Sequence, residues 1–271
     1  MVEVKSSREI ELMREAGHIV YETHQYLKPF IKPGITTKEI DDLARDFIIS
    51  KGATPSCKGY EGYPANICIS INDEVVHGIA SSKRKLKEGD IVTLDICACY
   101  KGYHGDSGWS YPVGKVSSDA QYILEHTEEA LYAGLSVIKN GCRVGDISHA
   151  VEEYANRYHL GVIKELTGHG IGRNLHEEPY VPNYGKAGSG PILRTGMVIA
   201  VEPMLTIGSP DIYMLEDGWT IKTDDGSLSG HFEHTVVITD DGYEILTKEW
   251  LYGKRWYNWS WRKSSWNITW W

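Results

Sequence analysis

The chain has 271 residues, of which 41% are hydrophobic and 24% are charged. This length can bury a full core as one large domain or two small ones, and the composition is ordinary for a globular protein. The formal net charge of −9 argues against a nucleic-acid partner or an anionic membrane surface, because both require a basic face.

The N-terminal segment lacks the apolar core of a secretion signal, and the chain contains no run of about eighteen apolar residues that could span a bilayer. The five cysteines are odd in number and have none of the spacings of a disulfide framework. Reduced thiols in a cytoplasmic protein without a membrane span are the simplest interpretation.

The first predicted helix begins with a capping box, in which the side chains of Ser6 and Glu9 bond to each other's backbone N–H groups. Apolar residues follow at helical spacing from Ile10 to Leu27, and Pro33-Gly34 is expected to end the helix.

A second helix is predicted from the capping box of Thr36 and Glu39 to Gly52. The same order of elements returns later in the chain. A long helix is predicted over residues 118–139, and a further helix follows it after Asn140-Gly141.

The two helical passages align at a fixed offset of 107 residues, which places Ile40 on Ile147. The same offset aligns residues 86–95 with 193–202, so each passage has a Leu-x-x-Gly turn followed by a strand that ends in an acid. Chance similarity of amphipathic helices is the alternative interpretation. The shared register favours a single α+β domain of two helix-helix-sheet halves related by an approximate two-fold axis.

Acidic residues occupy four matched strand positions in these halves: Asp95, Asp106, Glu202 and Glu233. The last strand residues before each are apolar or small, and both Asp106 and Glu233 come two residues after a histidine. A buried carboxylate without a partner costs several kcal/mol, so each needs a cation or a proton. One such acid alone would favour solvent exposure on an edge strand. Four together favour a metal centre, in which oxygen ligands suit Mn, Mg or Ca and an imidazole admits Co, Fe or Zn.

An imidazole of this kind is offered by His169, which has a glycine on each side. Glycine permits close backbone approach and unusual backbone angles around a ligand. The segment lacks the spacing of a phosphate-binding loop. His176 follows seven residues later, and His77 has the same His-Gly pairing, so both are further site candidates.

The ordered motifs together resemble a known family. They are Asp95, Asp106, Gly168-His169-Gly170-Ile171-Gly172, His176-Glu177-Glu178-Pro179, Glu202-Pro203-Met204 and Glu233-His234-Thr235. This order resembles the type I methionine aminopeptidases in their short bacterial form, from about residue 6 to 249. The resemblance implies the pita-bread fold, in which two pseudo-symmetric halves form a curved antiparallel sheet backed by helices. That expectation agrees with the repeat.

The resemblance also implies two divalent ions of Co, Mn, Fe or Zn, bridged by Asp106 and Glu233. Asp95 would chelate one ion, and His169 and Glu202 the other. These ions would activate a shared water for hydrolysis.

Other residues receive substrate and catalytic roles from the same resemblance. Glu202 is the implied general base, and His77 and His176 would contact the scissile peptide and stabilise the tetrahedral intermediate. The lining of the methionine pocket is implied to be Cys57, Tyr60, Tyr63, Cys68 and Trp219. Leu175 and Cys97 depart from the family pattern, because many relatives have an aromatic residue and a threonine there. Neither change removes a ligand.

The implied activity is removal of the initiator methionine from nascent proteins and peptides whose second residue is small. The implied partners are the N-terminal methionine and, transiently, the ribosome, and the implied state is a cytoplasmic monomer. Three alternatives stay open: a proline-directed peptidase of the same fold, a catalytically silent binding protein, and a metal-dependent phosphoesterase.

Residues 1–249 are predicted to form one catalytic domain, and the composition changes over residues 250–271. Seven of the nine tryptophans lie in this tail: Trp250, Trp256, Trp259, Trp261, Trp266, Trp270 and Trp271. Interspersed basic residues would suit a membrane or nucleic-acid contact. The tail shows no helical periodicity, and an incidental segment is the favoured interpretation.

Overall fold

The computed structural model describes residues 2–249, so the tryptophan-rich segment 250–271 lies outside the described residues. None of the helices described in this range has the length and apolarity needed to cross a membrane.

The first half opens with two helices whose starts agree with the sequence. Helix α1 (Ser7–Leu27) has Ser6 as its N-cap, and helix α2 (Thr37–Ser50) has Thr36, each with both bonds of the capping box. Helix α1 ends six residues before Pro33 and passes into the short 3₁₀ helix η1 (Lys28–Phe30). The reason is Pro29, whose ring cannot be accommodated in a continuing α-helix.

Four strands of the first half form one antiparallel sheet. They are β1 (Thr54–Pro55), β2 (Cys68–Ile71), β4 (Ile91–Tyr100) and β5 (Tyr103–Pro112). The short 3₁₀ helix η2 (Tyr60–Gly62) lies between β1 and β2. Strand β4 is the centre of this sheet, because it pairs with the other three.

The second half repeats this plan with helices α3 (Ser118–Ser136) and α4 (Val144–Arg157). Helix α3 ends three residues before the predicted Lys139. A five-stranded antiparallel sheet follows the order β15 (Tyr243–Ile245), β14 (His234–Ile238), β9 (Val198–Val201), β7 (Thr167–Gly170) and β8 (Glu177–Pro182).

Two further sheets of three antiparallel strands complete the described part of the chain. One contains β13 (Ser229–His231), β10 (Met204–Thr206) and β6 (Gly161–Val162); the other contains β11 (Ile212–Met214), β12 (Ile221–Thr223) and β3 (Glu74–Val76).

The internal repeat is present in the backbone itself. Helices α2 and α4 have the same length and are displaced by 107 residues at both ends. The isolated bridge between Thr36 and Lys85 has its counterpart between Arg143 and Ile192, again displaced by 107 at both residues. The prediction of two matched halves in an α+β pita-bread fold is therefore confirmed.

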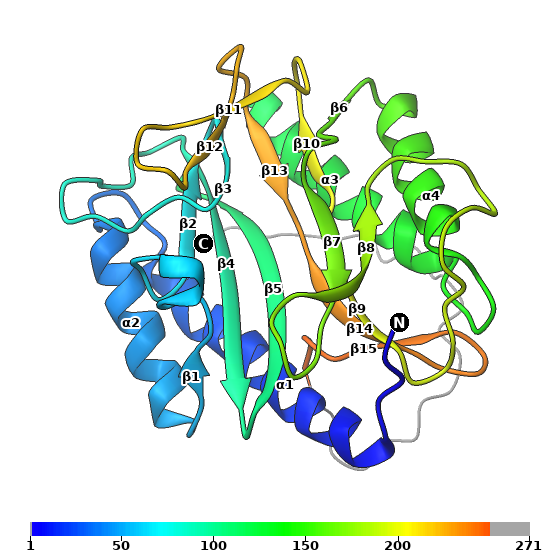
Figure 1. Ribbon diagram of the computed structural model, residues 1–271. Coiled ribbons are helices and arrows are strands. Elements are labelled where there is room, and N and C mark those ends of the chain that lie inside the picture. Colours follow the sequence, from blue (N-terminus) through cyan, green and yellow to red (C-terminus); the bar gives the residue numbers. More distant parts are fainter. Residues whose placement is uncertain (1, 250–271) are drawn as a thin grey trace.

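Each half has its own hydrophobic core between helices and sheet. Figure 1 shows α1 and α2 beside the sheet of β2, β4 and β5, while in the second half α3 packs on β13 and β10 and α4 packs on β8. A third buried cluster contains residues of both halves, among them Cys57, Cys68, Ile171 and Val237. The helices cover one face of each sheet, and the opposite face can carry polar side chains.

The two halves meet where β5 lies against the segment of β13 and β14, which we call the seam. Across the seam, side chains of one half form hydrogen bonds with the backbone of the other half. The Thr235 hydroxyl accepts from the Asp106 N–H at 3.0 Å and donates to the Asp106 carbonyl at 2.8 Å. Ser107 Oγ donates to the Glu233 carbonyl at 2.7 Å, and the Glu233 N–H donates to Gly108 at 2.8 Å. The seam therefore fixes Asp106 and Glu233 relative to each other.

Candidate active site

The five predicted metal ligands come from five separate strands or strand ends. Asp95 lies on β4, Asp106 on β5 and His169 on β7, while Glu202 follows β9 directly and Glu233 lies between β13 and β14. Antiparallel pairing brings Asp95 near Asp106 in one sheet and His169 near Glu202 in the other. The structure therefore brings together residues that are up to 138 positions apart in the chain.

The potential ligand atoms fall into two groups, within each of which all atoms lie within 4.8 Å of one another. One group is Asp95, Cys97 and Asp106, and the other is Asp106, His169 and Glu233. Asp106 belongs to both, which is the arrangement expected of a bridging carboxylate. Glu202 is held next to the second group, with Oε1 3.5 Å from His169 Nε2.

The tautomer of His169 follows from its hydrogen bond. Nδ1 lies 2.8 Å from the carbonyl oxygen of Gly170, which can only accept, so Nδ1 carries the proton. Nε2 is then left with a bare lone pair and points toward Asp106 Oδ2 at 3.7 Å. Burial lowers the pKa of His169 to about 3, which keeps the ring neutral. A neutral imidazole fixed through its other nitrogen is the usual form of a histidine metal ligand.

The carboxylates lack a positive partner in the described part of the chain. Burial, together with neighbouring acids, raises the pKa of Asp95, Glu202 and Glu233 well above the usual values, and burial raises that of Asp106 to about 8. Glu233 Oε1 has no hydrogen-bond partner, and no lysine or arginine within residues 2–249 lines this cavity. Four clustered carboxyl groups, of which Asp106 and Glu233 are buried and Asp95 and Glu202 are partly buried, fit divalent cations together with one neutral imidazole.

A cavity of about 210 Å³ opens beside these groups, and all twelve predicted site residues line it. Its aromatic wall contains Tyr63 and Trp219, whose rings meet edge to face at 5.1 Å. The Tyr63 hydroxyl donates to the Gly78 carbonyl at 2.8 Å, which holds the ring in place. Cys57 and Cys68 add polarizable thiols, and an unbranched thioether side chain packs well against such a surface.

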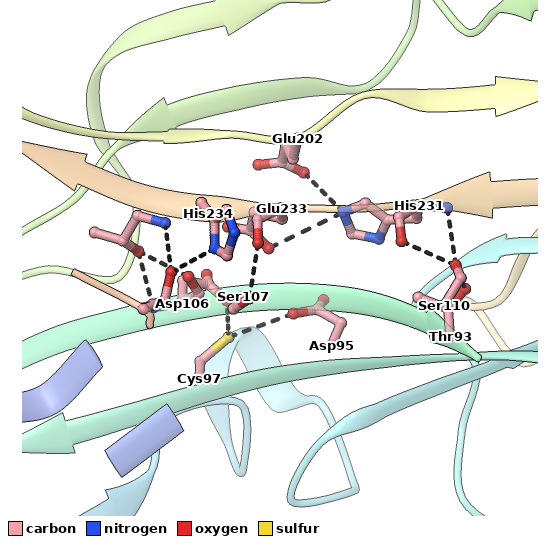
Figure 2. A network of polar contacts seen from close by, with 12 residues as sticks. Thr93, Asp95, Cys97, Asp106, Ser107, Ser110, Glu202, His231, Glu233 and His234 are labelled. Atoms are coloured by element: carbon pink, nitrogen blue, oxygen red, sulfur yellow. Dashed lines mark hydrogen bonds and ion pairs between the residues drawn. The ribbon is translucent and has the colours of Figure 1, made fainter. Parts of the chain in front are cut away.

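The cysteines of the cavity contact one another as well as the acids. Cys57 is hydrogen-bonded to the thiols of Cys68 and Cys97, which lowers the pKa of Cys57 and raises those of its partners. Cys97 Sγ also lies 2.8 Å from Asp106 Oδ1. Figure 2 shows this thiol between Asp95 and Asp106. The departure from the family pattern at Cys97 therefore places sulfur directly beside two predicted ligands.

The two predicted substrate histidines both line the cavity, where His176 is exposed and His77 is partly buried. Nδ1 of His176 is 2.8 Å from the Tyr60 hydroxyl, and its ring meets that of His169 edge to face at 4.3 Å. His77 has a left-handed backbone with φ of 59°, which is uncommon for a residue with a side chain and points to a functional constraint. A side chain at the following Gly78 would meet the Ile69 carbonyl at 2.2 Å, so only glycine permits this turn.

One histidine of the cavity has no role predicted from the sequence. Of the two histidines that precede an acid by two positions, His104 is bonded to Ser56 and does not line the cavity. His231 does line it, with Nε2 3.8 Å from Glu202 Oε2. The spacing was visible in the sequence, but only the pairing of β13 with β10 shows which histidine faces inward.

Comparison with known proteins identifies the family of this chain. The family model of metallopeptidase family M24 matches residues 11–240. The chain belongs to this family. It is 51% identical to methionine aminopeptidase 1 of Bacillus subtilis over 248 residues, which cover 92% of this chain and all of that protein.

Solved structures agree with this M24 assignment. A methionine aminopeptidase from Thermotoga maritima is 42% identical, with a TM-score of 0.91 over 92% of this chain and all of that one. An Xaa-Pro dipeptidase from Bacillus anthracis is 26% identical, with a TM-score of 0.73, and only 62% of it is covered. The predicted resemblance to methionine aminopeptidases is confirmed, and the M24 chain is a metal-dependent peptidase.

Proposed function

We propose that this protein is an aminopeptidase that removes an N-terminal methionine from proteins and peptides whose second residue is small. The observation that carries the proposal is the cavity itself, in which a thiol-lined and aromatic slot opens directly onto the buried carboxylate cluster. The named relatives support the same activity over nearly the whole described chain.

The metal-binding part of the proposal uses the ligands already described. Asp106 and Glu233 would be shared between two divalent ions, Asp95 would complete one site, and His169 and Glu202 would complete the other. When bound, such ions supply a Lewis acid and lower the pKa of a bound water toward neutrality. Mn, Co, Fe and Zn all suit this mixture of carboxylate and imidazole ligands.

The carboxylate of Glu202 is placed to hold the proton that the attacking water loses. Its backbone is fixed, because Asn183 Nδ2 donates to the Glu202 carbonyl at 3.0 Å. Its side chain lines the cavity and is 13% exposed, and its carboxylate oxygens would accept that proton. These are the properties of a general base.

The two substrate histidines would act on the peptide carbonyl. His176 is oriented by Tyr60, and His77 by the left-handed turn before Gly78. Both imidazoles line the cavity, and each would donate a hydrogen bond to the oxygen on which negative charge develops. The free amine of the substrate would bind next to Asp95, so only a chain terminus fits.

The slot accounts for the proposed preference for methionine as the first residue of the substrate. Its walls are Tyr63, Trp219 and the thiols of Cys57 and Cys68, within a cavity of about 210 Å³. A flexible thioether fills such a space, whereas a larger aromatic side chain does not. We further propose that the protein acts as a cytoplasmic monomer on chains emerging from the ribosome.

Hydrolysis of short peptides tests the proposal. The peptides Met-Ala-Ser and Met-Gly-Ser are expected to release methionine in the presence of Mn²⁺, and Met-Leu-Ser and N-acetyl-Met-Ala-Ser are the matched controls. Released methionine is measured by chromatography. Equal cleavage of Leu-Ala-Ser, or of the acetylated peptide, would contradict a methionine slot and an amine site, respectively. Preferential cleavage of Met-Pro-Ser over Met-Ala-Ser would favour a proline-directed peptidase.

A further inference from the structure

The side chain of His231 is a buried imidazole without a hydrogen bond on either nitrogen. The residue is 2% exposed, and both Nδ1 and Nε2 lack a partner in the structure. A buried polar group left in this way is unfavourable and calls for an explanation in the working molecule. Because His231 lines the cavity beside the predicted metal ligands, the missing partner is to be sought there.

The backbone of His231 is held by hydrogen bonds across the seam. Ser110 Oγ accepts from the His231 N–H at 3.1 Å and donates to its carbonyl at 2.9 Å. The ring lies directly over Gly108, where a Cβ atom would come within 2.7 Å of Cε1. The seam therefore reserves a space for this imidazole and fixes its direction.

Nε2 faces two of the acids, as Figure 2 shows. Nε2 lies 3.8 Å from Glu202 Oε2 and 4.0 Å from Glu233 Oε2. These distances exceed that of a hydrogen bond, and a shift of about 1 Å brings the closer pair into range. No other described residue competes for Nε2.

The imidazoles of His169 and His231 thus approach the two oxygens of the Glu202 carboxylate. They differ in which ring nitrogen can carry the proton. His169 faces Glu202 Oε1 with a bare lone pair, because its proton is on Nδ1 and is bonded to Gly170. His231 has no acceptor that fixes its proton on Nδ1. Its Nε2 is therefore free to carry the proton and to donate to Glu202 Oε2.

We propose that His231 is the positioning residue of Glu202. Its Nε2–H donates to Oε2 and so turns Oε1 toward His169 and the ion that these two residues would share. The inference rests on the proposed function, because it assigns a partner to the general base named there. Residues that orient metal ligands in this way typically contribute about 10- to 100-fold to metal affinity or rate.

Two substitutions separate a donor role from a packing role. His231→Gln keeps an N–H donor of similar reach, and His231→Leu removes it while filling part of the same space. His234 provides a matched control, since it is also buried but its Nδ1 lies 2.9 Å from Thr247 Oγ1. Mn²⁺ binding by calorimetry, kcat and KM for Met-Ala-Ser, and Tm in a chelator are measured for each variant.

The expected result for His231→Leu is a Tm in chelator equal to or above that of the wild type, because an unpartnered polar group has been removed from the core. Mn²⁺ affinity and kcat are expected to fall about 10- to 100-fold with KM nearly unchanged. His231→Gln is expected to recover most of both losses. His234→Leu, which loses an existing bond, is expected to lower Tm.

The inference is overturned by wild-type Mn²⁺ affinity and kcat in His231→Leu. It is equally overturned if His231→Gln is as impaired as His231→Leu, or if His231→Leu lowers Tm as His234→Leu does, because those results describe a packing residue. A wild-type chain that releases no methionine, or a Glu202→Gln variant with full activity, contradicts the proposed function instead. The calorimetric comparison of His231→Leu with the wild type still decides the role of His231 in that case.

Discussion

Replacement of Thr235 by valine tests whether the seam holds the active site together. The hydroxyl of Thr235 is the partner of both the N–H and the carbonyl of Asp106. Valine has nearly the same shape, so Thr235→Val leaves no cavity. It leaves two buried backbone groups unbonded beside a predicted bridging ligand.

The magnitude follows from counting those groups. Each unsatisfied buried polar group costs roughly 1–3 kcal/mol, so the free energy of unfolding is expected to fall by about 2–6 kcal/mol. For a chain of this length that corresponds to a decrease in Tm of roughly 4–20 °C. Because Asp106 also loses its fixed backbone, metal affinity is expected to fall about 10- to 100-fold.

The assay is urea unfolding in a chelator, followed by tryptophan fluorescence, with Thr23→Val as the control. Thr23 and Thr235 are both fully buried, but Thr23 Oγ1 only donates to the Ile19 carbonyl within helix α1. That carbonyl keeps its helical partner, so Thr23→Val is expected to cost less than about 1 kcal/mol. Equal unfolding midpoints for the two variants would refute the structural role given to the seam.

Three further predictions concern protonation, the two histidines of the glycine-rich segment, and space at the seam. In metal-free chains the pKa of the buried Asp106 is raised from 3.8 to about 8, so its protonated form contributes stability that is full below pH 4 and is lost as the pH rises toward 8. The urea midpoint measured in chelator should therefore decline across this pH window. The decline should be smaller in the Asp106→Asn variant. His169→Ala should lose bound metal as well as rate, whereas His176→Ala should keep its metal and lose kcat by roughly 100- to 1,000-fold. If metal analysis shows that His176→Ala loses metal and His169→Ala keeps it, the roles assigned to the two histidines are reversed. Gly108→Ala should destabilise the fold by about 1–3 kcal/mol in urea, because its Cβ would lie 2.7 Å from the His231 ring, and an unchanged midpoint would show that the ring has room to move.

Much of the fold was predictable because it depends on local signals. The capping boxes at Ser6 and Thr36 fix the starts of two helices, and the 107-residue repeat fixes the plan of the second half. The end of α1 was predicted wrongly, although Pro29 provides a local reason for it to stop. The apolar spacing ends at Leu27, where the helix also ends, and the Pro33-Gly34 turn lies six residues beyond it.

The lining of the cavity was predictable in large part from the sequence, but the bonds between its residues were not. Acids such as Asp95 and Glu202 are conspicuous in apolar strands, and the order of motifs supplied the remaining candidates. The bonds of Thr235 to Asp106, and the unpartnered ring of His231, depend on strands that meet only in the folded chain. No pattern along the sequence encodes such contacts, because their partners are more than 100 residues apart.

The most direct test of the account is a measurement of bound metal and methionine release on one sample. The chain is stripped with a chelator, Mn²⁺ or Co²⁺ is added back in steps, and metal per chain and turnover of Met-Ala-Ser are recorded at each step. The account predicts no turnover in the stripped chain, recovery in parallel with bound metal, and saturation at about two ions per chain. Full turnover in a chain that retains no divalent metal would contradict it.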